Sequence, residues 1–266
     1  MKTQYALIAS SVLSSALFSA FAGAATVDLT TAGSSGAING AKFFQYSSDL
    51  PAGTGVFGPF LRIQQNGTEA GYNTNGTLEF DTKTGTWTHA IQLGDIPLIN
   101  GYRQFALDIN ETASKTNPLL SLDQVRLFTT SNANLTGYSF GSNATEVYNM
   151  DTGGDNWVKL DYSVSGSGSG RADMLMYVPN SYFTGAGATD STYIVLYSQF
   201  GLQGNGSNGL DSSGGFEEWS SNRLPGTPGT DYPVPPASVP VPAAAWLFMS
   251  GLLGMVGVAR KQGVKA

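Results

Sequence analysis

The chain has 266 residues, of which 13 are basic and 19 acidic, and it contains no cysteine and one histidine. This composition excludes disulfides and a thiolate nucleophile, and it lacks the usual ligands of a zinc site. Nine of the basic residues and all 19 acidic ones lie between residues 25 and 236, and the resulting formal charge of −10 disfavours binding to nucleic acid.

The first 24 residues are typical of a cleaved secretory signal peptide. Lys2 provides the positive start, residues 5–21 form a run of apolar and small side chains, and Ala22 and Ala24 form an A-x-A cleavage site. We therefore expect residues 1–24 to be removed on export and the mature chain to begin near Ala25.

The body of the chain, residues 25–222, predicts an all-β fold. Apolar and polar residues alternate over short stretches, glycine-rich turns separate these stretches, and no long helical pattern interrupts them. The clearest single strands are predicted at residues 60–64, 104–109, 124–129, 157–164, 174–178 and 193–198. Many short strands without helices favour a β-sandwich of jelly-roll type.

Residues 77–81 and 86–93 are predicted to pair as a hairpin around Gly85. In that register His89 shares a face with Trp87 and Ile91, which predicts a buried histidine rather than a catalytic base or a metal ligand. A hydrolytic triad normally requires such a base. We therefore expect that the protein is not an enzyme.

The alternative of a different class is a secreted, polysaccharide-active hydrolase that uses an Asp/Glu pair. Glu217 and Glu218 are the most conspicuous acidic neighbours. Adjacent residues of a strand point to opposite faces, so this doublet is not itself predicted to be the catalytic pair.

Two acidic stretches are candidate calcium loops, because Ca²⁺ takes six to eight oxygen ligands. The first contains Asp151 and Asp155 in the sequence DTGGDN, and the second contains Asp108 and Glu111 in DINE. Neither matches an EF-hand loop, and an ordinary solvated turn is the alternative for each. A polysaccharide-binding face would instead need exposed aromatic rings, for which the strand patterns suggest Trp157, Tyr193 and Tyr197.

The C-terminal part of the chain predicts a spacer followed by a membrane helix. Residues 223–238 are rich in proline and glycine and should be extended. Residues 243–259 carry no charge and would span about 25 Å as a helix, near the lower limit for crossing a bilayer. Arg260 and Lys261 follow directly and should stay cytoplasmic, which places the body on the other side of the inner membrane.

Residues 239–266 resemble the VPLPA variant of the PEP-CTERM sorting signal. The motif is Val239, Pro240, Val241, Pro242 and Ala243, followed by the helix and the basic pair, with Val241 where the commonest form has an acid. The resemblance implies export, recognition by an exosortase, removal of the tail, and delivery to the surface of a Gram-negative cell.

That family usually accompanies exopolysaccharide or biofilm, which implies a structural or adhesive role in the cell envelope. The stretches LDINE at residues 107–111 and LLSLD at 119–123 are similar to those of uncharacterised exported proteins of the same group. The alternative to sorting is a binding protein that stays permanently anchored in the membrane.

Overall fold

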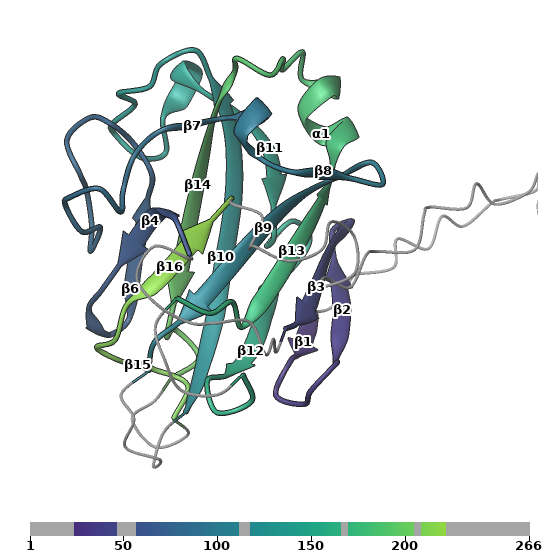
Figure 1. Cartoon of the computed structure of the whole chain (residues 1–266), viewed down its shortest axis with the longest axis vertical. Helices are drawn as coiled ribbons and strands as arrows, with labels where there is room; N and C mark the ends of the chain where they lie inside the picture. The colour runs from purple at the N-terminus through teal and green to yellow at the C-terminus, as the bar shows by residue number, and fades with distance from the viewer. Residues whose placement is uncertain (1–23, 47–56, 112–117, 166–169, 205–208, 222–266) are drawn as a thin grey trace, which may run out of the picture.

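The computed structural model describes residues 24–46, 57–111, 118–165, 170–204 and 209–221 (Figure 1). Nearly all of the regular structure in these residues is β-strand, so the prediction of an all-β protein is confirmed. The helices described are the short α1, Asn180–Gly185, and two single turns of 3₁₀-helix at Leu93–Asp95 and Gly141–Asn143.

The first of two large sheets has seven strands in the order β1-β12-β10-β14-β6, with β11 also paired to β10 and β7 to β14. All of its pairs are antiparallel except β1 with β12. The strand bounds are β1 Thr26–Asp28, β6 Glu69–Tyr72, β7 Ile91–Gln92, β10 Leu119–Thr130, β11 Thr145–Asn149, β12 Trp157–Asp161 and β14 Tyr193–Phe200.

The second large sheet also has seven strands, in the order β2-β3-β13-β9-β16-β4, with β8 also paired to β9. All of its pairs are antiparallel. The strand bounds are β2 Ser35–Ile38, β3 Ala41–Gln45, β4 Pro59–Ile63, β8 Leu98–Ile99, β9 Tyr102–Ile109, β13 Met174–Pro179 and β16 Glu217–Ser220, and a separate small sheet pairs β5, Asn66–Gly67, with β15, Ser212–Ser213.

The two large sheets share one hydrophobic core. Residues of β10 and β14 in the first sheet and of β9, β13 and β4 in the second belong to the same buried cluster. Figure 1 shows β9 and β13 crossing the long strands β10 and β14 at an angle. Trp219 of β16 is fully buried in this core, and its indole N–H donates to the Ser198 hydroxyl of β14 at 3.0 Å, which joins the sheets by a polar contact as well.

All six predicted single strands are present as β4, β9, β10, β12, β13 and β14, although β12 ends at Asp161. The predicted hairpin at residues 77–93 is wrong. Its residues form no ladder with each other, and only Ile91–Gln92 belongs to a strand, which pairs with β14. His89 is exposed rather than buried, because its segment lies along the edges of both sheets instead of entering the core.

Several predictions concern segments outside the described residues. These are the signal peptide with Ala22 and Ala24, the spacer, the sorting motif Val239–Ala243, the helix at 243–259, and Arg260 with Lys261. Among the described residues, no helix has the length and apolarity needed to cross a membrane.

Candidate functional site

Residues 79–89 form an edge segment that crosses from the first sheet to the second. Its Asp81 N–H donates to the carbonyl of Ala70 in β6, and its Lys83 N–H donates to the carbonyl of Arg62 in β4. The segment therefore occupies the backbone groups of two strands that end their sheets, one in each sheet. Such a position satisfies edge groups that would otherwise face solvent.

The edge segment displays Phe80, whose side chain is 55% exposed although its neighbours are aromatic. Its backbone has φ +58°, a left-handed conformation that costs a phenylalanine energy. The ring lies 5.6 Å from that of Tyr138 and 6.0 Å from that of Tyr197, centroid to centroid, both edge to face. A strained backbone thus holds an apolar ring at the surface on top of other rings.

Tyr138 extends this arrangement over the outer side of the first sheet. It stacks on Tyr197 of β14 with centroids 4.2 Å apart, and its hydroxyl accepts from the Arg126 guanidinium at 2.7 Å. Arg126 also forms an ion pair with the exposed Glu146 at 2.6 Å. We call Phe80, Tyr138, Arg126 and Glu146 the aromatic surface. It combines ring faces with charged hydrogen-bonding groups.

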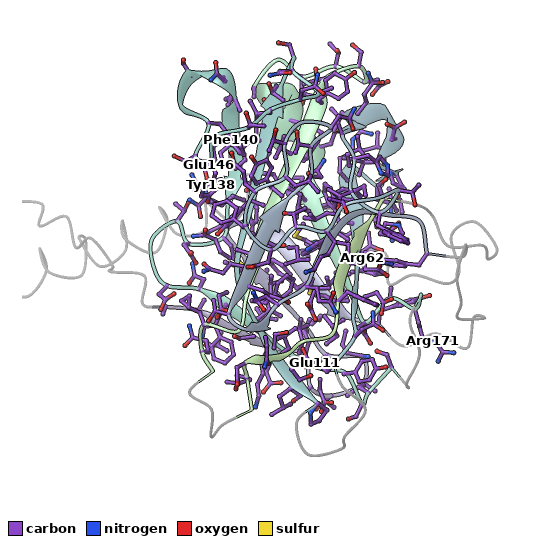
Figure 2. All side chains as sticks on the ribbon, turned by 90° about the vertical axis from the view of Figure 1, so that its left-hand side faces the viewer. Arg62, Glu111, Tyr138, Phe140, Glu146 and Arg171 are labelled. Atoms are coloured by element: carbon purple, nitrogen blue, oxygen red, sulfur yellow. The ribbon has the colours of Figure 1, made fainter. Side chains whose placement is uncertain are left out.

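A second exposed aromatic residue, Trp87, lies at the other end of the edge segment and is 39% exposed. The Arg62 guanidinium lies over its ring at 4.1 Å and over the Phe216 ring at 4.5 Å, and it also pairs with the buried Glu218. Figure 2 shows Arg62 on the opposite side of the molecule from Tyr138, Phe140 and Glu146. Trp87 is therefore separate from the aromatic surface.

The second unusual feature is a carboxylate cluster made of Glu69, Glu111, Asp211 and Glu217. Glu217 alternates with Trp219 on the inner face of β16, and it pairs in register with Ile109 of β9 and Ile63 of β4, both core residues. Glu69 lies on β6 of the other sheet. Glu69 and Glu217 thus occupy inward-facing positions between the sheets, where an apolar side chain is usual.

Glu111 reaches this cluster from just beyond the end of β9, near the lower end of the molecule in Figure 2. Gly215, just before β16, makes the approach possible, because a Cβ there would lie 1.2 Å from the Asn110 carbonyl oxygen. A side chain at position 215 would push the two segments apart. This glycine is therefore needed for Glu111 and Glu217 to share one site.

Few hydrogen-bond donors reach the carboxylate cluster. Glu69 accepts from the Gln65 N–H at 2.5 Å, and Glu111 accepts from the N–H and hydroxyl of Ser213. Both oxygens of Glu217 and one oxygen each of Glu69, Glu111 and Asp211 are buried without a donor. Glu217 is 0% and Glu69 1% exposed, so water does not cover these groups at the surface.

Burial and mutual repulsion shift the pKa values of Glu69, Glu111 and Glu217 upward. Burial raises the pKa of Glu111 to about 7, with the charges of Glu69 and Asp211 adding to it. Burial also raises the pKa of Glu217 well above its usual range, and the charges of Glu69, Glu111 and Asp108 act in the same direction. Glu69 and Glu217 contact each other, and neither offers a donor while both are ionised.

A pair of aspartates lies beside this cluster. Asp108 of β9 accepts from the Gly170 N–H at 2.6 Å, and Asp173 accepts from the Ile109 N–H at 2.8 Å. Burial raises the pKa of Asp108 to about 7, and burial together with the Asp108 charge raises the pKa of Asp173 well above its usual range. The pair therefore favours holding a proton in the folded protein.

The two predicted calcium loops have different surroundings. Asp155 is exposed, and Asp151 accepts from Gln124 at 2.7 Å and from the Asn156 N–H at 3.1 Å, so this turn is stabilised by its own hydrogen bonds. Asp108 and Glu111 are buried and lie in or beside the carboxylate cluster. In the described parts of the chain, no three acidic or histidine side chains already have the spacing that would hold a metal ion.

The aromatic residues suggested by the strand patterns are less exposed than Phe80. Trp157 and Tyr193 are half-buried, and Tyr197 is 5% exposed beneath Tyr138. The sequence patterns did not indicate Phe80 or Tyr138 as exposed aromatic residues. They also did not indicate Glu69 as a buried residue, because its strand is short and the residues before it are polar.

Comparison of the chain with protein-family models, with curated protein sequences and with solved structures finds no match. The proposals below therefore depend on the residues of this chain and on the arrangement described above.

Proposed function

We propose that this chain is an exported cell-envelope protein whose body binds exopolysaccharide through the aromatic surface in a structural or adhesive role. The observation that carries this proposal is the exposure of Phe80 at a strained backbone position, above the stacked pair Tyr138 and Tyr197. Sugar rings present C–H faces that pack on aromatic rings, and their hydroxyls hydrogen-bond to groups such as Arg126 and Glu146.

The body is proposed to be a β-sandwich of jelly-roll type. Its support is that two seven-stranded, largely antiparallel sheets contribute alternate side chains to one core. In such an architecture the outer faces of the sheets remain available for contacts. The aromatic surface lies on one of these outer faces.

The proposed route to the envelope is export, followed by sorting of the tail by an exosortase in a Gram-negative bacterium. Support comes from the sequence of both ends, from Lys2 to Ala24 and from Val239 to Lys261. Mass spectrometry of the protein recovered from its native envelope tests this route. A start near Ala25 and loss of everything beyond about Pro242 is expected, whereas a C-terminus at Ala266 would favour the permanently anchored alternative.

The hydrolase alternative gains little support from the carboxyl pair Glu69 and Glu217. Glu69 and Glu217 contact each other and are 1% and 0% exposed. A glycosidase needs two carboxyls about 5 to 10 Å apart beside the sugar. Any hydrolytic activity would therefore have to use other acidic residues.

The binding proposal is tested by sedimentation of the full-length protein with the exopolysaccharide of its own cells. Phe80→Gly removes the ring and suits the left-handed backbone, so the fold should be unaffected. We expect affinity to fall about fivefold, as loss of one aromatic contact of about 1 kcal/mol implies.

The matched control is Trp87→Ala, which removes an exposed ring on the other side of the molecule and should leave the affinity unchanged. Equal affinity of the wild type and Phe80→Gly would contradict the proposed surface. Loss of binding in Trp87→Ala alone would move the binding site to the surface around Arg62.

A further inference from the structure

We propose that the aromatic surface binds uncharged polysaccharide and rejects acidic polysaccharide, and that Glu146 determines this preference. The inference rests on the proposed function, because it names the class of polysaccharide that the same surface binds. Acidic polysaccharides carry carboxylates, as in uronic acids, whereas uncharged ones present hydroxyls and C–H groups alone. The charged residues of the surface decide between these two chemistries.

The first reason is that Arg126, the cation of this surface, already has partners. Its Nε donates to the Glu146 carboxylate at 2.6 Å, and its Nη1 donates to the Tyr138 hydroxyl at 2.7 Å. An arginine binds a carboxylate most strongly through two parallel N–H bonds from one edge of the guanidinium. Each of the two edges already uses one of its nitrogens in the folded protein. A carboxylate of a polysaccharide could therefore form such a pair of bonds only by displacing Glu146 or Tyr138.

The second reason is the negative charge around the rings. Glu79 accepts from the Tyr138 N–H at 3.2 Å. Asp81 lies in the same edge segment, and its charge acts on Tyr197. With Glu146, three carboxylates therefore lie around one guanidinium, and the whole chain has a formal net charge of −6. Like charges brought together at a binding surface oppose association, so a polymer that carries carboxylates should be repelled.

The third reason is that the surface offers the contacts that an uncharged sugar needs. The Phe80 ring is 55% exposed, so the C–H face of a sugar can pack on it. Glu146 holds Arg126 while its own side chain stays 35% exposed, so its carboxylate can also accept from a sugar hydroxyl. A carboxylate in this position favours ligands that donate hydrogen bonds and disfavours ligands that carry its own charge.

The experiment compares two polysaccharides that differ in charge and share one backbone. The first is the exopolysaccharide of the protein's own cells, freed of acidic material on an anion-exchange resin. The second is the same preparation after its primary hydroxyls have been oxidised to carboxylates. Each is immobilised through its reducing end, and biolayer interferometry measures the dissociation constant of the full-length protein. At low salt we expect the constant to be about tenfold higher for the oxidised polymer, and about 0.5 M NaCl should remove most of this difference by screening.

The outcomes separate this inference from the proposed function. Equal or tighter binding to the oxidised polymer would overturn the uncharged preference and leave polysaccharide binding intact. Binding only to the acidic material retained by the resin would do the same. Binding to none of the three preparations would overturn the proposed function, and this inference with it.

Glu146→Gln tests the residue that determines the preference. The change keeps the size of the side chain and an oxygen that can accept from Arg126, but it removes the charge that neutralises the guanidinium. The ratio of the two dissociation constants, oxidised over uncharged, should therefore fall about fivefold relative to the wild type. An unchanged ratio in Glu146→Gln would overturn the role of this residue.

The matched control is Asp190→Asn, which also removes one carboxylate charge from an exposed side chain. Asp190 pairs with Arg103 of the other sheet and belongs to neither the aromatic surface nor the edge segment. Its replacement should leave the ratio of the dissociation constants unchanged. If the ratio fell as far in Asp190→Asn as in Glu146→Gln, the net charge of the chain would set the preference, and the assignment to Glu146 would be wrong.

Discussion

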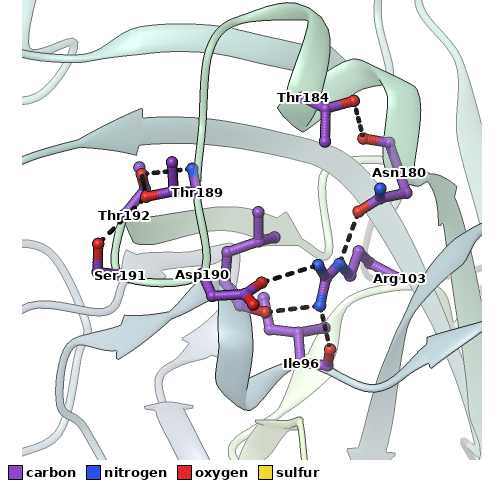
Figure 3. Close-up of polar contacts among 9 residues, drawn as sticks. Ile96, Arg103, Asn180, Thr184, Thr189, Asp190, Ser191 and Thr192 are labelled. Carbon is purple, nitrogen blue, oxygen red and sulfur yellow. Dashed lines mark hydrogen bonds and ion pairs between the residues drawn. The ribbon is translucent and has the colours of Figure 1, made fainter.

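The two ends of strand β9 bury charge in opposite ways. Near its start, Arg103 is 7% exposed and donates to four acceptors, namely the carbonyls of Leu93 and Ile96 and the side chains of Asn180 and Asp190 (Figure 3). Just beyond its other end, Glu111 belongs to a group of buried carboxylates with five oxygen atoms that lack a donor. The same strand thus connects a satisfied charge with an unsatisfied one.

The difference lies in what the surrounding backbone offers. Around Arg103, the 3₁₀ turn at Leu93–Asp95 and the start of α1 direct carbonyl and amide oxygens at the guanidinium, which needs acceptors only. Around the carboxylates, the backbone N–H groups of Gln65 and Ser213 supply two donors, and the remaining oxygens face one another. We conclude that the protein's own groups satisfy the charge at the Arg103 end, whereas the carboxylate end lacks enough donors while all of its groups are ionised.

The largest effect that this comparison predicts is on stability in Arg103→Met. The change leaves the Ile96 carbonyl buried without its Arg103 donor and leaves the Leu93 carbonyl with the Ile96 N–H alone. The free energy of unfolding should therefore fall by about 3 kcal/mol. Urea unfolding followed by circular dichroism would measure this. Arg103→Lys keeps the charge but lacks the planar fork, and it should lose less. If the free energy of unfolding fell by less than 1 kcal/mol in Arg103→Met, the hydrogen bonds of Arg103 would contribute little to stability.

An intermediate effect is predicted for Asp173→Asn. Because the pKa of Asp108 rises to about 7 and that of Asp173 is raised well above its usual range, the folded protein binds more protons than the unfolded chain above about pH 4. Stability contributed by this pair is therefore present at low pH and lost as the pH rises through about 7. In chelator, the free energy of unfolding should fall less steeply between pH 5 and 7 in Asp173→Asn, by about 1 kcal/mol per pH unit.

The control for this pH dependence is Asp28→Asn. The hydroxyl and N–H of Thr30 hold the pKa of Asp28 below its usual range, so this carboxylate is ionised in both states between pH 5 and 7. Its replacement should leave the slope unchanged. Identical slopes in the wild type and Asp173→Asn would mean that the aspartate pair does not hold a proton in the fold.

The sequence predicted the strands at the centre of the fold and missed what lies at its edges. Strands β9 and β14 are rich in apolar residues, and in β9 Phe105, Leu107 and Ile109 alternate with other residues, so the sequence of the strand alone reveals it. Residues 77–93 also contain apolar residues at alternate positions, but their backbone bonds go to Ala70, Arg62 and Phe60 in two different sheets. Such long-range pairing leaves no pattern in the local sequence, so His89 was predicted to be buried although it is exposed.

The buried carboxylates were predictable only in part. Asp108 and Glu111 were found as an acidic stretch after an apolar strand, and that stretch does lead into the cluster. Glu217 carried a usable signal, since it alternates with Trp219 and must share its inner face. The sequence around Glu69 gave no such signal. Its partner Glu217 is 148 positions away, and the two residues meet only because the two sheets pack face to face.

The smallest effect, and the sharpest check on the satisfied end, is expected for Asp190→Asn. Asp190 lies 3.4 Å from Arg103, but its side chain is 82% exposed, whereas the Leu93 and Ile96 carbonyls are bonded to Arg103 in the interior. Water screens an ion pair of this kind, so the free energy of unfolding should change by less than about 0.5 kcal/mol. If Asp190→Asn instead cost as much as Arg103→Met, the charge pair would dominate this end. The two ends of β9 would then differ because Asp190 supplies a negative charge to Arg103, and the carbonyl acceptors alone would not be enough to stabilise the buried arginine.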